Sequence, residues 1–305
     1  MNLRKPLLGG VEMGGTKCVC LLGTDHDDIR EQHSIPTGND PATTLERIEE
    51  TLRDWRGSYG PIAALGVASF GPLDLASKSA SYGFITSTTK PGWRNTDVAR
   101  RLARASGVPV GFNTDVNGAA LAEGRWGAAR GLSDFAYVTV GTGIGVGLVV
   151  AGRPVCGFGH AELGHIRVVR HTGDRWPGSC AFHGDCLEGL ASGAAIEQRL
   201  GTPASSLAPN DPVWELVIHA LAQLLHTLVL ATAPQRILLG GGVMHAQRHL
   251  FEPLRRELQR SLNHYVEAPQ LGARIAEYIR PPALGELAGP LGSLALAQDA
   301  LAAVA

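Results

Sequence analysis

The sequence has no excess of charge of either sign. Lysine and arginine number 27, aspartate and glutamate number 28, and the net charge is −1 at pH 7. A protein that holds a nucleic-acid backbone needs a basic surface, which this composition does not supply. We therefore expect no nucleic-acid partner.

The sequence also lacks the marks of exported or membrane-bound chains. No run of about 20 apolar residues predicts a membrane span, and glycines and Glu12 interrupt the short apolar run near the amino terminus, which does not read as a signal peptide. There is no Asn-x-Ser/Thr sequon, and five cysteines are an odd number for a disulfide framework. We expect a cytoplasmic protein with no membrane partner.

Glycine is abundant, at 39 of 305 residues, in a chain of globular composition that is long enough for two domains. Residues 7–23 (LLGGVEM-GGT-KCVCLLG) and 135–152 (FAYVTV-GTG-IGVGLVVAG) share the pattern of strand, glycine-threonine turn and strand. This repeat predicts two similar α/β lobes; one doubly wound α/β domain is the alternative. We place the lobes at 1–115 and 116–305, with the C-terminal helix able to pack back on the first.

The remaining elements follow from apolar periodicity and turn residues. Further strands are expected near 30–36, 62–69, 108–113 and 236–242. Helices are expected near 41–55, 96–106, 115–129, 187–199, 211–232, 246–264 and 286–303. Residues 70–95 show few regular signals and predict a long, functional loop.

Three glycine-rich turns predict phosphate binding, because bare backbone N–H groups can approach an anion closely there. They are Gly14-Gly15-Thr16-Lys17, Gly141-Thr142-Gly143 and Gly240-Gly241-Gly242. A plain hairpin would explain any one of them. The sequence contains neither the G-x-x-x-x-G-K-[ST] loop nor a G-x-G-x-x-G segment that opens a helix.

Asp115 stands where a predicted strand gives way to a helix, in VGFNTDVNGAA. A carboxylate there can simply cap the helix. It can also accept the proton of an attacking hydroxyl, since phosphoryl transfer requires one positioned base. Asn113, Thr114 and Asn117 surround it with short polar side chains that suit sugar hydroxyls.

Histidine and cysteine gather between residues 160 and 188. Cys180-x-x-His183-x-x-Cys186, with His165 upstream, offers two thiolates and two imidazoles for a structural zinc ion. Free thiols beside surface histidines are the alternative, and a catalytic cysteine is a further one. Looser spacing makes Cys156, His160 and His171 weaker candidate ligands. Glu162 and Glu188 flank the cluster and are either surface acids or sugar contacts.

These motifs, taken in order, resemble the ROK family (repressors, open reading frames and kinases), and within it the bacterial fructokinase branch. The matching stretches are GGVEMGGTKCVC, GVASFGPLDL, TTKPGWRNTDV, GFNTDVNGAALAEGRWGAA, YVTVGTGIGVG, AELGHIRVVRH, CAFHGDCLEGLASG and ILLGGGV. The resemblance implies an actin-like, ribonuclease-H-type fold of two α/β lobes with the active site in the cleft. It also implies Mg-ATP as donor, a 6-phosphorylated sugar as product and a homodimer.

The resemblance further implies roles for individual residues, with Asp115 as the catalytic base. The ATP-contacting residues would be Gly14, Gly15, Thr16, Lys17, Gly141, Thr142, Gly143, Gly241 and Gly242. The sugar-contacting residues would be Asn95, Asn113, Glu162, His165 and Glu188. The zinc ligands would be His165, Cys180, His183 and Cys186, so that His165 has two candidate roles.

Three positions depart from the usual family pattern. Glu12 replaces the usual aspartate of the first motif, as in the fructokinase branch, and would hold Mg²⁺ through water. Thr114 replaces an asparagine before the base, which removes an amide from the sugar pocket and weakens the expectation of glucose recognition. His183 replaces a thiolate, an exchange that zinc accepts.

The expected activity is ATP-dependent phosphorylation of fructose at its 6-hydroxyl. Mannose, another hexose or an N-acetylhexosamine is the alternative substrate. From another class, the alternatives are a sugar-sensing repressor or a non-catalytic sugar-binding protein. The repressor needs an added helix-turn-helix domain, whereas the first glycine turn begins at Gly14; the intact Asp115 argues against the binding protein.

Overall fold

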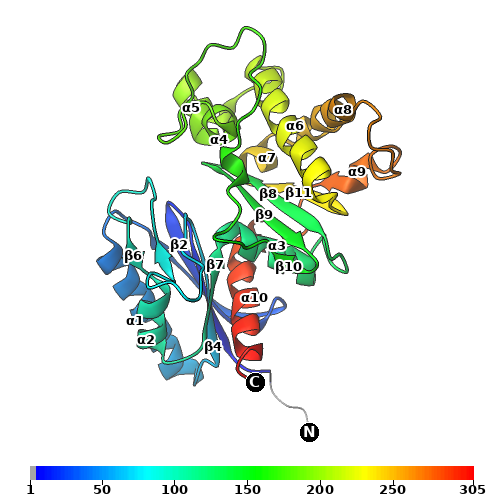
Figure 1. Ribbon diagram of the computed structural model, residues 1–305. Helices are drawn as coiled ribbons and strands as arrows, with labels where there is room; N and C mark the ends of the chain where they lie inside the picture. The colour runs from blue at the N-terminus through cyan, green and yellow to red at the C-terminus, as the bar shows by residue number, and fades with distance from the viewer. Residues whose placement is uncertain (1–4) are drawn as a thin grey trace. The chain divides into compact units, whose positions relative to one another are not determined.

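The computed structural model describes residues 5–305, which divide into two compact units (Figure 1). Unit 1 comprises the described part of Met1–Arg130 with Val155–His160 and Glu286–Ala305, and unit 2 comprises Gly131–Pro154 and Ala161–Gly285. The first division therefore falls after Arg130 rather than after residue 115. The reason is that helix α3 (Asp115–Trp126) packs against other elements of unit 1.

The sheet of unit 1 has five strands in the order β3-β2-β1-β4-β7. They are β1 (Leu8–Met13), β2 (Lys17–Asp25), β3 (Asp28–Pro36), β4 (Ala64–Ser69) and β7 (Val110–Thr114). The first three form an antiparallel meander, whereas β4 pairs in parallel with both β1 and β7. The carboxyl ends of β1, β4 and β7 consequently lie at one edge of the sheet.

The sheet of unit 2 repeats this arrangement in the order β10-β9-β8-β11-β12. Its strands are β8 (Phe135–Val140), β9 (Ile144–Val150), β10 (Arg153–Pro154), β11 (Arg236–Gly240) and β12 (Ile279–Arg280). β8 and β9 form the antiparallel hairpin, and β11 is parallel to both β8 and β12. The duplication predicted from the two glycine-turn hairpins is confirmed by this shared topology.

Helices α1 (Pro41–Tyr59) and α2 (Ala99–Ser106) pack together in unit 1. Asp40 caps α1 by accepting hydrogen bonds from the N–H groups of Ala42 and Thr43, and Pro41 occupies the first turn, as the sequence predicts. Between these helices lies the expected long loop, which contains only the short pair β5 (Phe84–Ile85) and β6 (Thr96–Asp97). Residues 96–98 therefore precede α2 rather than begin it.

The C-terminal helix α10 (Ala288–Ala302) belongs to unit 1, where it packs against β1, β4 and α3. Two glycines allow α10 and α3 to approach closely. A β-carbon on Gly292 would overlap the backbone of Gly118, so no larger residue fits at that crossing.

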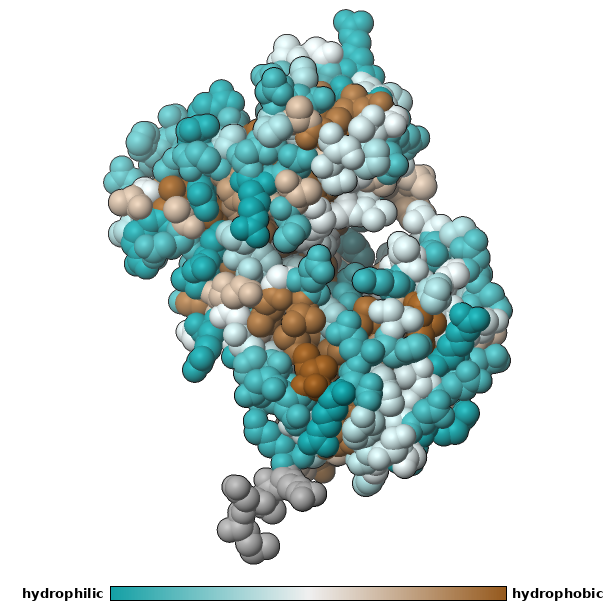
Figure 2. Space-filling view, turned by 180° about the vertical axis from the view of Figure 1, so that it is seen from behind, coloured by the Kyte–Doolittle hydropathy of each residue, from teal (hydrophilic) through white to brown (hydrophobic). Residues whose placement is uncertain are grey.

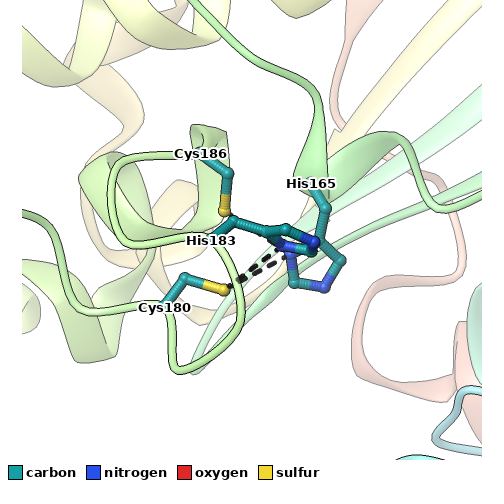
Figure 3. A group of neighbouring side chains, drawn as sticks. All are labelled: His165, Cys180, His183 and Cys186. Carbon is teal, nitrogen blue, oxygen red and sulfur yellow. Dashed lines mark hydrogen bonds between the residues drawn. The ribbon is translucent and has the colours of Figure 1, made fainter.

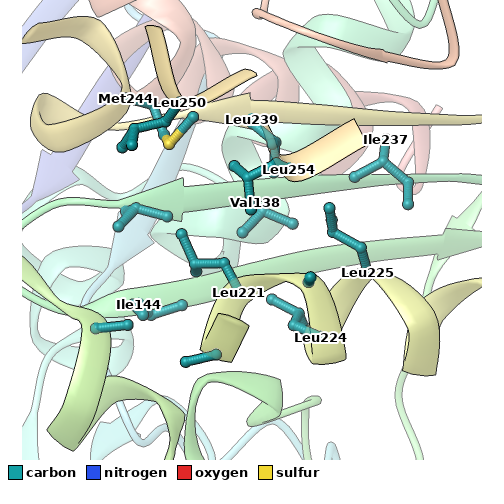
Figure 4. Packing of buried hydrophobic residues seen from close by; sticks show 14 of the residues in the cluster. Val138, Ile144, Leu221, Leu224, Leu225, Ile237, Leu239, Met244, Leu250 and Leu254 are labelled. Carbon is teal, nitrogen blue, oxygen red and sulfur yellow. The ribbon is translucent and has the colours of Figure 1, made fainter. Parts of the chain in front are cut away.

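The core of unit 2 lies between its sheet and the helices α6 (Val213–Thr232) and α8 (Phe251–Leu262). Figure 4 shows Leu221, Leu224 and Leu225 of α6 facing strand residues such as Val138. By length and composition alone, α6 is long and apolar enough to cross a membrane, although the sequence analysis predicted no such helix. More than half of its apolar window is buried inside the structure. The face in Figure 2 is mostly hydrophilic, with hydrophobic residues in small groups.

Two predicted helices of unit 2 are interrupted. The expected helix over 187–199 is α4 (Leu187–Ala191) and α5 (Gly193–Leu200), because Ser192 ends the first and caps the second by accepting from the N–H of Ala195. The expected helix over 246–264 is replaced by α7 (Gly242–Ala246), the 3-10 turn η3 (Arg248–Leu250) and α8. The remaining short elements are η1 (Leu163–His165), η2 (Ala204–Ser206), α9 (Ile275–Tyr278) and η4 (Gly285–Leu287).

Candidate active site

The turn between β1 and β2 presents exposed backbone. Gly15, Thr16 and Lys17 are exposed, and the turn is closed by a hydrogen bond from the Gly14 N–H to the Lys17 carbonyl (3.0 Å). A second clamp comes from Thr37, a residue that the sequence did not single out. Its hydroxyl donates to the Gly14 carbonyl (2.7 Å) and its N–H donates to the Thr16 carbonyl (3.0 Å). The turn is thus held at its carbonyls.

The turn between β8 and β9 is held in a similar way in unit 2. The Gly141 N–H donates to the Gly143 carbonyl (2.9 Å), and the Gly141 carbonyl accepts from the N–H of Gly193 at the start of α5 (2.7 Å). The hydroxyl-bearing Thr142 is exposed. These contacts fix the backbone of the turn and leave it accessible, which suits the approach of an anion.

The third glycine run lies against the second. Gly241 has φ 89°, and a β-carbon there would come within 2.5 Å of the Val140 carbonyl oxygen. A β-carbon on Gly141 would be 3.8 Å from the N–H nitrogen of Gly242. Unit 2 therefore brings together Gly141 to Gly143 and Gly241 with Gly242, two of the three predicted phosphate turns.

Asp115 is the first residue of α3, but it does not cap the helix. The cap is Thr114, whose hydroxyl accepts from the Asn117 N–H (3.1 Å). The Asp115 Oδ1 accepts from the Val116 N–H (2.8 Å) at the carboxyl end of β7. The interpretation of Asp115 as a plain helix cap is therefore wrong, and Thr114 has a structural role that its sequence position did not reveal.

The amides around Asp115 are ordered. The Asn113 Oδ1 accepts from the Thr114 N–H and from the Asn117 Nδ2, both at 2.8 Å. Asn117 is buried.

Asn95 has φ 56°, in the left-handed region, and its N–H donates to the Thr86 carbonyl (3.1 Å). This conformation fixes the backbone of Asn95, a predicted sugar contact.

Glu12 lies on β1, where burial is the main factor that raises the pKa of its carboxyl group to about 7. The negative charge of Asp115 raises the pKa further, and the nearby Lys17 lowers it. Unit 1 thus brings together two carboxylates and one ammonium group. Carboxylate oxygens that repel one another in a buried place favour a hard cation, which fits the predicted Mg²⁺ site.

The predicted zinc ligands converge in unit 2, as Figure 3 shows. The His165 Nδ1 lies 3.5 Å from the Cys186 Sγ and 3.7 Å from the Cys180 Sγ, and the His183 Nδ1 lies 3.6 Å from the Cys180 Sγ. Tetrahedral zinc with ordinary bond lengths separates sulfur and nitrogen ligands by about 3.6 Å. The donor set and its spacing therefore fit zinc.

The weaker candidate ligands lie outside the cluster. Cys156 is exposed, the His160 Nε2 accepts from the Leu73 N–H (2.9 Å), and the His171 Nε2 lies 3.3 Å from the Glu215 Oε1. Without a bound cation, burial first and then Cys180 raise the pKa of the Cys186 thiol to about 11. That pKa disfavours a catalytic thiolate at Cys186.

His165 and Glu188 connect this cluster to the second glycine turn. The His165 Nδ1 faces the thiols, while its Nε2 lies 3.9 Å from the Glu188 Oε1. The Glu188 Oε2 accepts from the Ile144 N–H (3.0 Å), and a β-carbon on Gly143 would lie 2.6 Å from that oxygen. Glu162 is also near, since burial raises the pKa of its carboxyl group, His165 lowers it and Glu188 raises it.

The chain is similar to known proteins over nearly its whole length. The model of the ROK family matches residues 8–300. The chain belongs to the ROK family. Among its relatives, a fructokinase of Zymomonas mobilis is 41% identical over 97% of this chain and 98% of its own. A fructokinase of Pediococcus pentosaceus is 39% identical over 97% and 99%.

A solved structure of another ROK protein has the same fold as this chain. The ROK hexokinase of Thermus thermophilus has a TM-score of 0.77 and 29% identity, covering 97% of this chain and 99% of its own. The predicted fold class, an actin-like arrangement of duplicated α/β domains, is confirmed by this likeness and by the repeated sheet order.

Proposed function

We propose that this ROK protein is an ATP-dependent fructokinase that transfers the γ-phosphoryl group to the 6-hydroxyl of fructose. The main support is full-length similarity to fructokinases at 39–41% identity. The site geometry agrees with this proposal in two ways. Thr114, and not Asp115, caps α3. In each unit a glycine turn is held by hydrogen bonds and still presents exposed backbone.

In the proposed mechanism, Asp115 accepts the proton of the 6-hydroxyl as that oxygen attacks the γ-phosphorus in line. The bond between the γ-phosphorus and the bridging oxygen breaks, and ADP leaves. Lys17 and the N–H groups of the glycine turns stabilise negative charge on the phosphoryl oxygens. Glu12 would hold Mg²⁺ through water, and the ion would supply further charge neutralisation. Gly241 and Gly242 would contact the nucleotide.

The sugar would be oriented by Asn95, Asn113, Glu162 and Glu188. Because the Asn113 Oδ1 already accepts two hydrogen bonds, its Nδ2 is the group offered to a sugar oxygen. Structural zinc on His165, Cys180, His183 and Cys186 would hold the segment that bears Glu188. With its Nδ1 on zinc, His165 could still meet the sugar through its Nε2.

A coupled ADP-release assay over fructose, mannose, glucose, allose and N-acetyl sugars tests this proposal. We expect the highest kcat/KM for fructose. A higher value for another hexose would reassign the substrate, and no sugar-dependent ADP release would overturn the kinase assignment in favour of sugar binding alone. Light scattering tests the proposed homodimer. None of the five cysteines, which all lie in the described part of the chain, forms a disulfide, and this fits the proposed cytoplasmic location.

A further inference from the structure

Gly289 stands at the second position of helix α10, in its first turn. Its backbone conformation does not require glycine, because its φ lies outside the left-handed region that glycine favours. Glycine is also the poorest helix former after proline. Pro290 follows directly, and the residue before a proline resists helical backbone unless it lacks a β-carbon, which is one local reason for glycine. A second reason lies in the surrounding structure.

The surroundings of Gly289 give this second reason. A β-carbon there would overlap the Glu12 Oε1 and would lie 2.5 Å from the Glu12 Cδ and 3.1 Å from its Oε2. These three nearest atoms all belong to one carboxylate. Gly292, three residues later, differs, because its β-carbon would meet only the backbone of Gly118 and Ala119.

The Glu12 side chain, and not its backbone, must move to admit a β-carbon. Its backbone is fixed in the centre of the sheet, opposite Val19 on β2 and Ala68 on β4. Its side chain is largely buried, with the charges of Asp115 and Lys17 close by. A displaced carboxylate would therefore change its distance to these groups.

We propose that Gly289 is a positioning residue for phosphoryl transfer, because its missing β-carbon provides the space in which the Glu12 carboxylate faces the metal-nucleotide end of the site. This inference rests on the proposed function. A glutamate at position 12 reaches one methylene further than an aspartate, and Gly289 accommodates that extra length. Gly289 acts only through Glu12 and touches neither substrate.

The first test is Gly289→Ala. Alanine adds a β-carbon before Pro290 and against Glu12, so the thermal midpoint without added Mg²⁺ should fall, but only modestly, because the far end of the Glu12 side chain can move. Displacement of Glu12 should raise the Mg²⁺ concentration needed for half-maximal activity and should lower kcat. Together these changes should lower kcat/KM about 10- to 100-fold, while KM for fructose stays within about twofold of the wild-type value. Electron paramagnetic resonance of Mn²⁺ with a non-hydrolysable ATP analogue should show weaker Mn²⁺ binding.

Gly57→Ala is the matched control. Gly57 is an exposed glycine of α1, and a β-carbon there meets nothing within 4 Å. This variant adds a helical methyl group that meets no neighbour, and it should keep wild-type Mg²⁺ dependence. If Gly289→Ala leaves both the Mg²⁺ dependence and Mn²⁺ binding unchanged, Gly289 serves packing alone and the proposal fails.

The second test combines Gly289→Ala with Glu12→Asp. The shorter side chain withdraws from the added methyl group, so the alanine should cost at least about fivefold less in kcat/KM and in Mn²⁺ affinity when Glu12→Asp is already present. Equal costs in both backgrounds would overturn the proposal. Wild-type protein without fructose-dependent ADP release would instead overturn the proposed function, while the Mn²⁺ measurements would still report on Glu12 and Gly289.

Discussion

The Glu188 carboxylate accepts a hydrogen bond from the Ile144 N–H at 3.0 Å. Ile144 directly follows the Gly141-Thr142-Gly143 turn, and Glu188 lies two residues after Cys186, a predicted zinc ligand. The other carboxylate oxygen lies 3.9 Å from the His165 Nε2. One carboxylate therefore links the predicted zinc cluster to a predicted phosphate turn. A substitution that moves either the cluster or the turn should also change the geometry of the other.

Substitutions of Glu188 test this link. Glu188→Ala removes the acceptor for the Ile144 N–H and should raise KM for ATP about 10-fold, whereas Glu188→Gln retains an acceptor oxygen and should raise it less than about threefold. Steady-state kinetics with ATP varied at saturating fructose measures this. Because Glu188 is also a proposed sugar contact, KM for fructose should rise in both variants. An unchanged KM for ATP in Glu188→Ala would refute the link.

Metal analysis of the purified protein should find about one zinc per chain. Cys180→Ser should reduce this to less than half, and Cys156→Ser, which alters an exposed cysteine outside the cluster, should not. Removal of zinc with a chelator should lower the thermal midpoint by about 5 °C or more, because only the folded chain presents the ligands together. Substoichiometric zinc with no loss during purification would contradict the site.

Asp115→Asn should lower kcat by about 10²- to 10⁴-fold, since an amide cannot accept the hydroxyl proton. The fold should persist, because Thr114 rather than Asp115 caps α3. The measurements are kcat and the thermal midpoint, with Asp54→Asn on the exposed face of α1 as the control. Near-normal turnover in the Asp115 variant would remove this residue from its catalytic role.

Glu12 should make stability depend on pH when no Mg²⁺ is added. Its pKa is about 7 in the folded chain, against an ordinary value of 4.5. As pH rises through this window, the unfolded chain loses the Glu12 proton before the folded chain does, so the free energy of unfolding falls. Below the window both states are protonated, and above it the full cost of the buried charge is present.

Glu12→Gln removes that cost. The variant should gain stability relative to the wild type as pH rises from about 4.5 to 7, by up to about 3 kcal/mol. Urea unfolding at several pH values measures the difference, and Glu46→Gln at an exposed position of α1 controls for loss of a carboxylate. If the difference in free energy of unfolding between Glu12→Gln and the wild type does not change with pH, burial does not raise the pKa of Glu12.

Local sequence patterns predicted the repeated architecture and the convergence of His165, Cys180, His183 and Cys186, while zinc itself stays a prediction. The strand-turn-strand hairpins and the Cys180-x-x-His183-x-x-Cys186 spacing are short-range features that need few distant contacts to specify them. The split of residues 187–199 at Ser192 was missed, because a serine can lie within a helix or cap one, and only packing decides.

Long-range relationships could not be predicted from local patterns. The contact between Gly289 and Glu12 joins β1 to α10, which are far apart in the sequence. The local pattern GELAGPLGS does not indicate which residue Gly289 would contact. The same holds for α3, whose membership of unit 1 depends on the Gly118 and Gly292 crossing. The roles of the predicted ATP and sugar residues stay predictions until tested.

Helix α10 contributes to the core of unit 1 although all of unit 2 precedes it in the chain. During synthesis, the sheet of unit 1 emerges from the ribosome long before the helix that covers β1 and β4. Unit 2 has its strands and core helices available before residue 286 is made, so it can complete its fold first. The sheet of unit 1 therefore keeps apolar surface uncovered until α10, which follows all of unit 2 in the sequence, has been made.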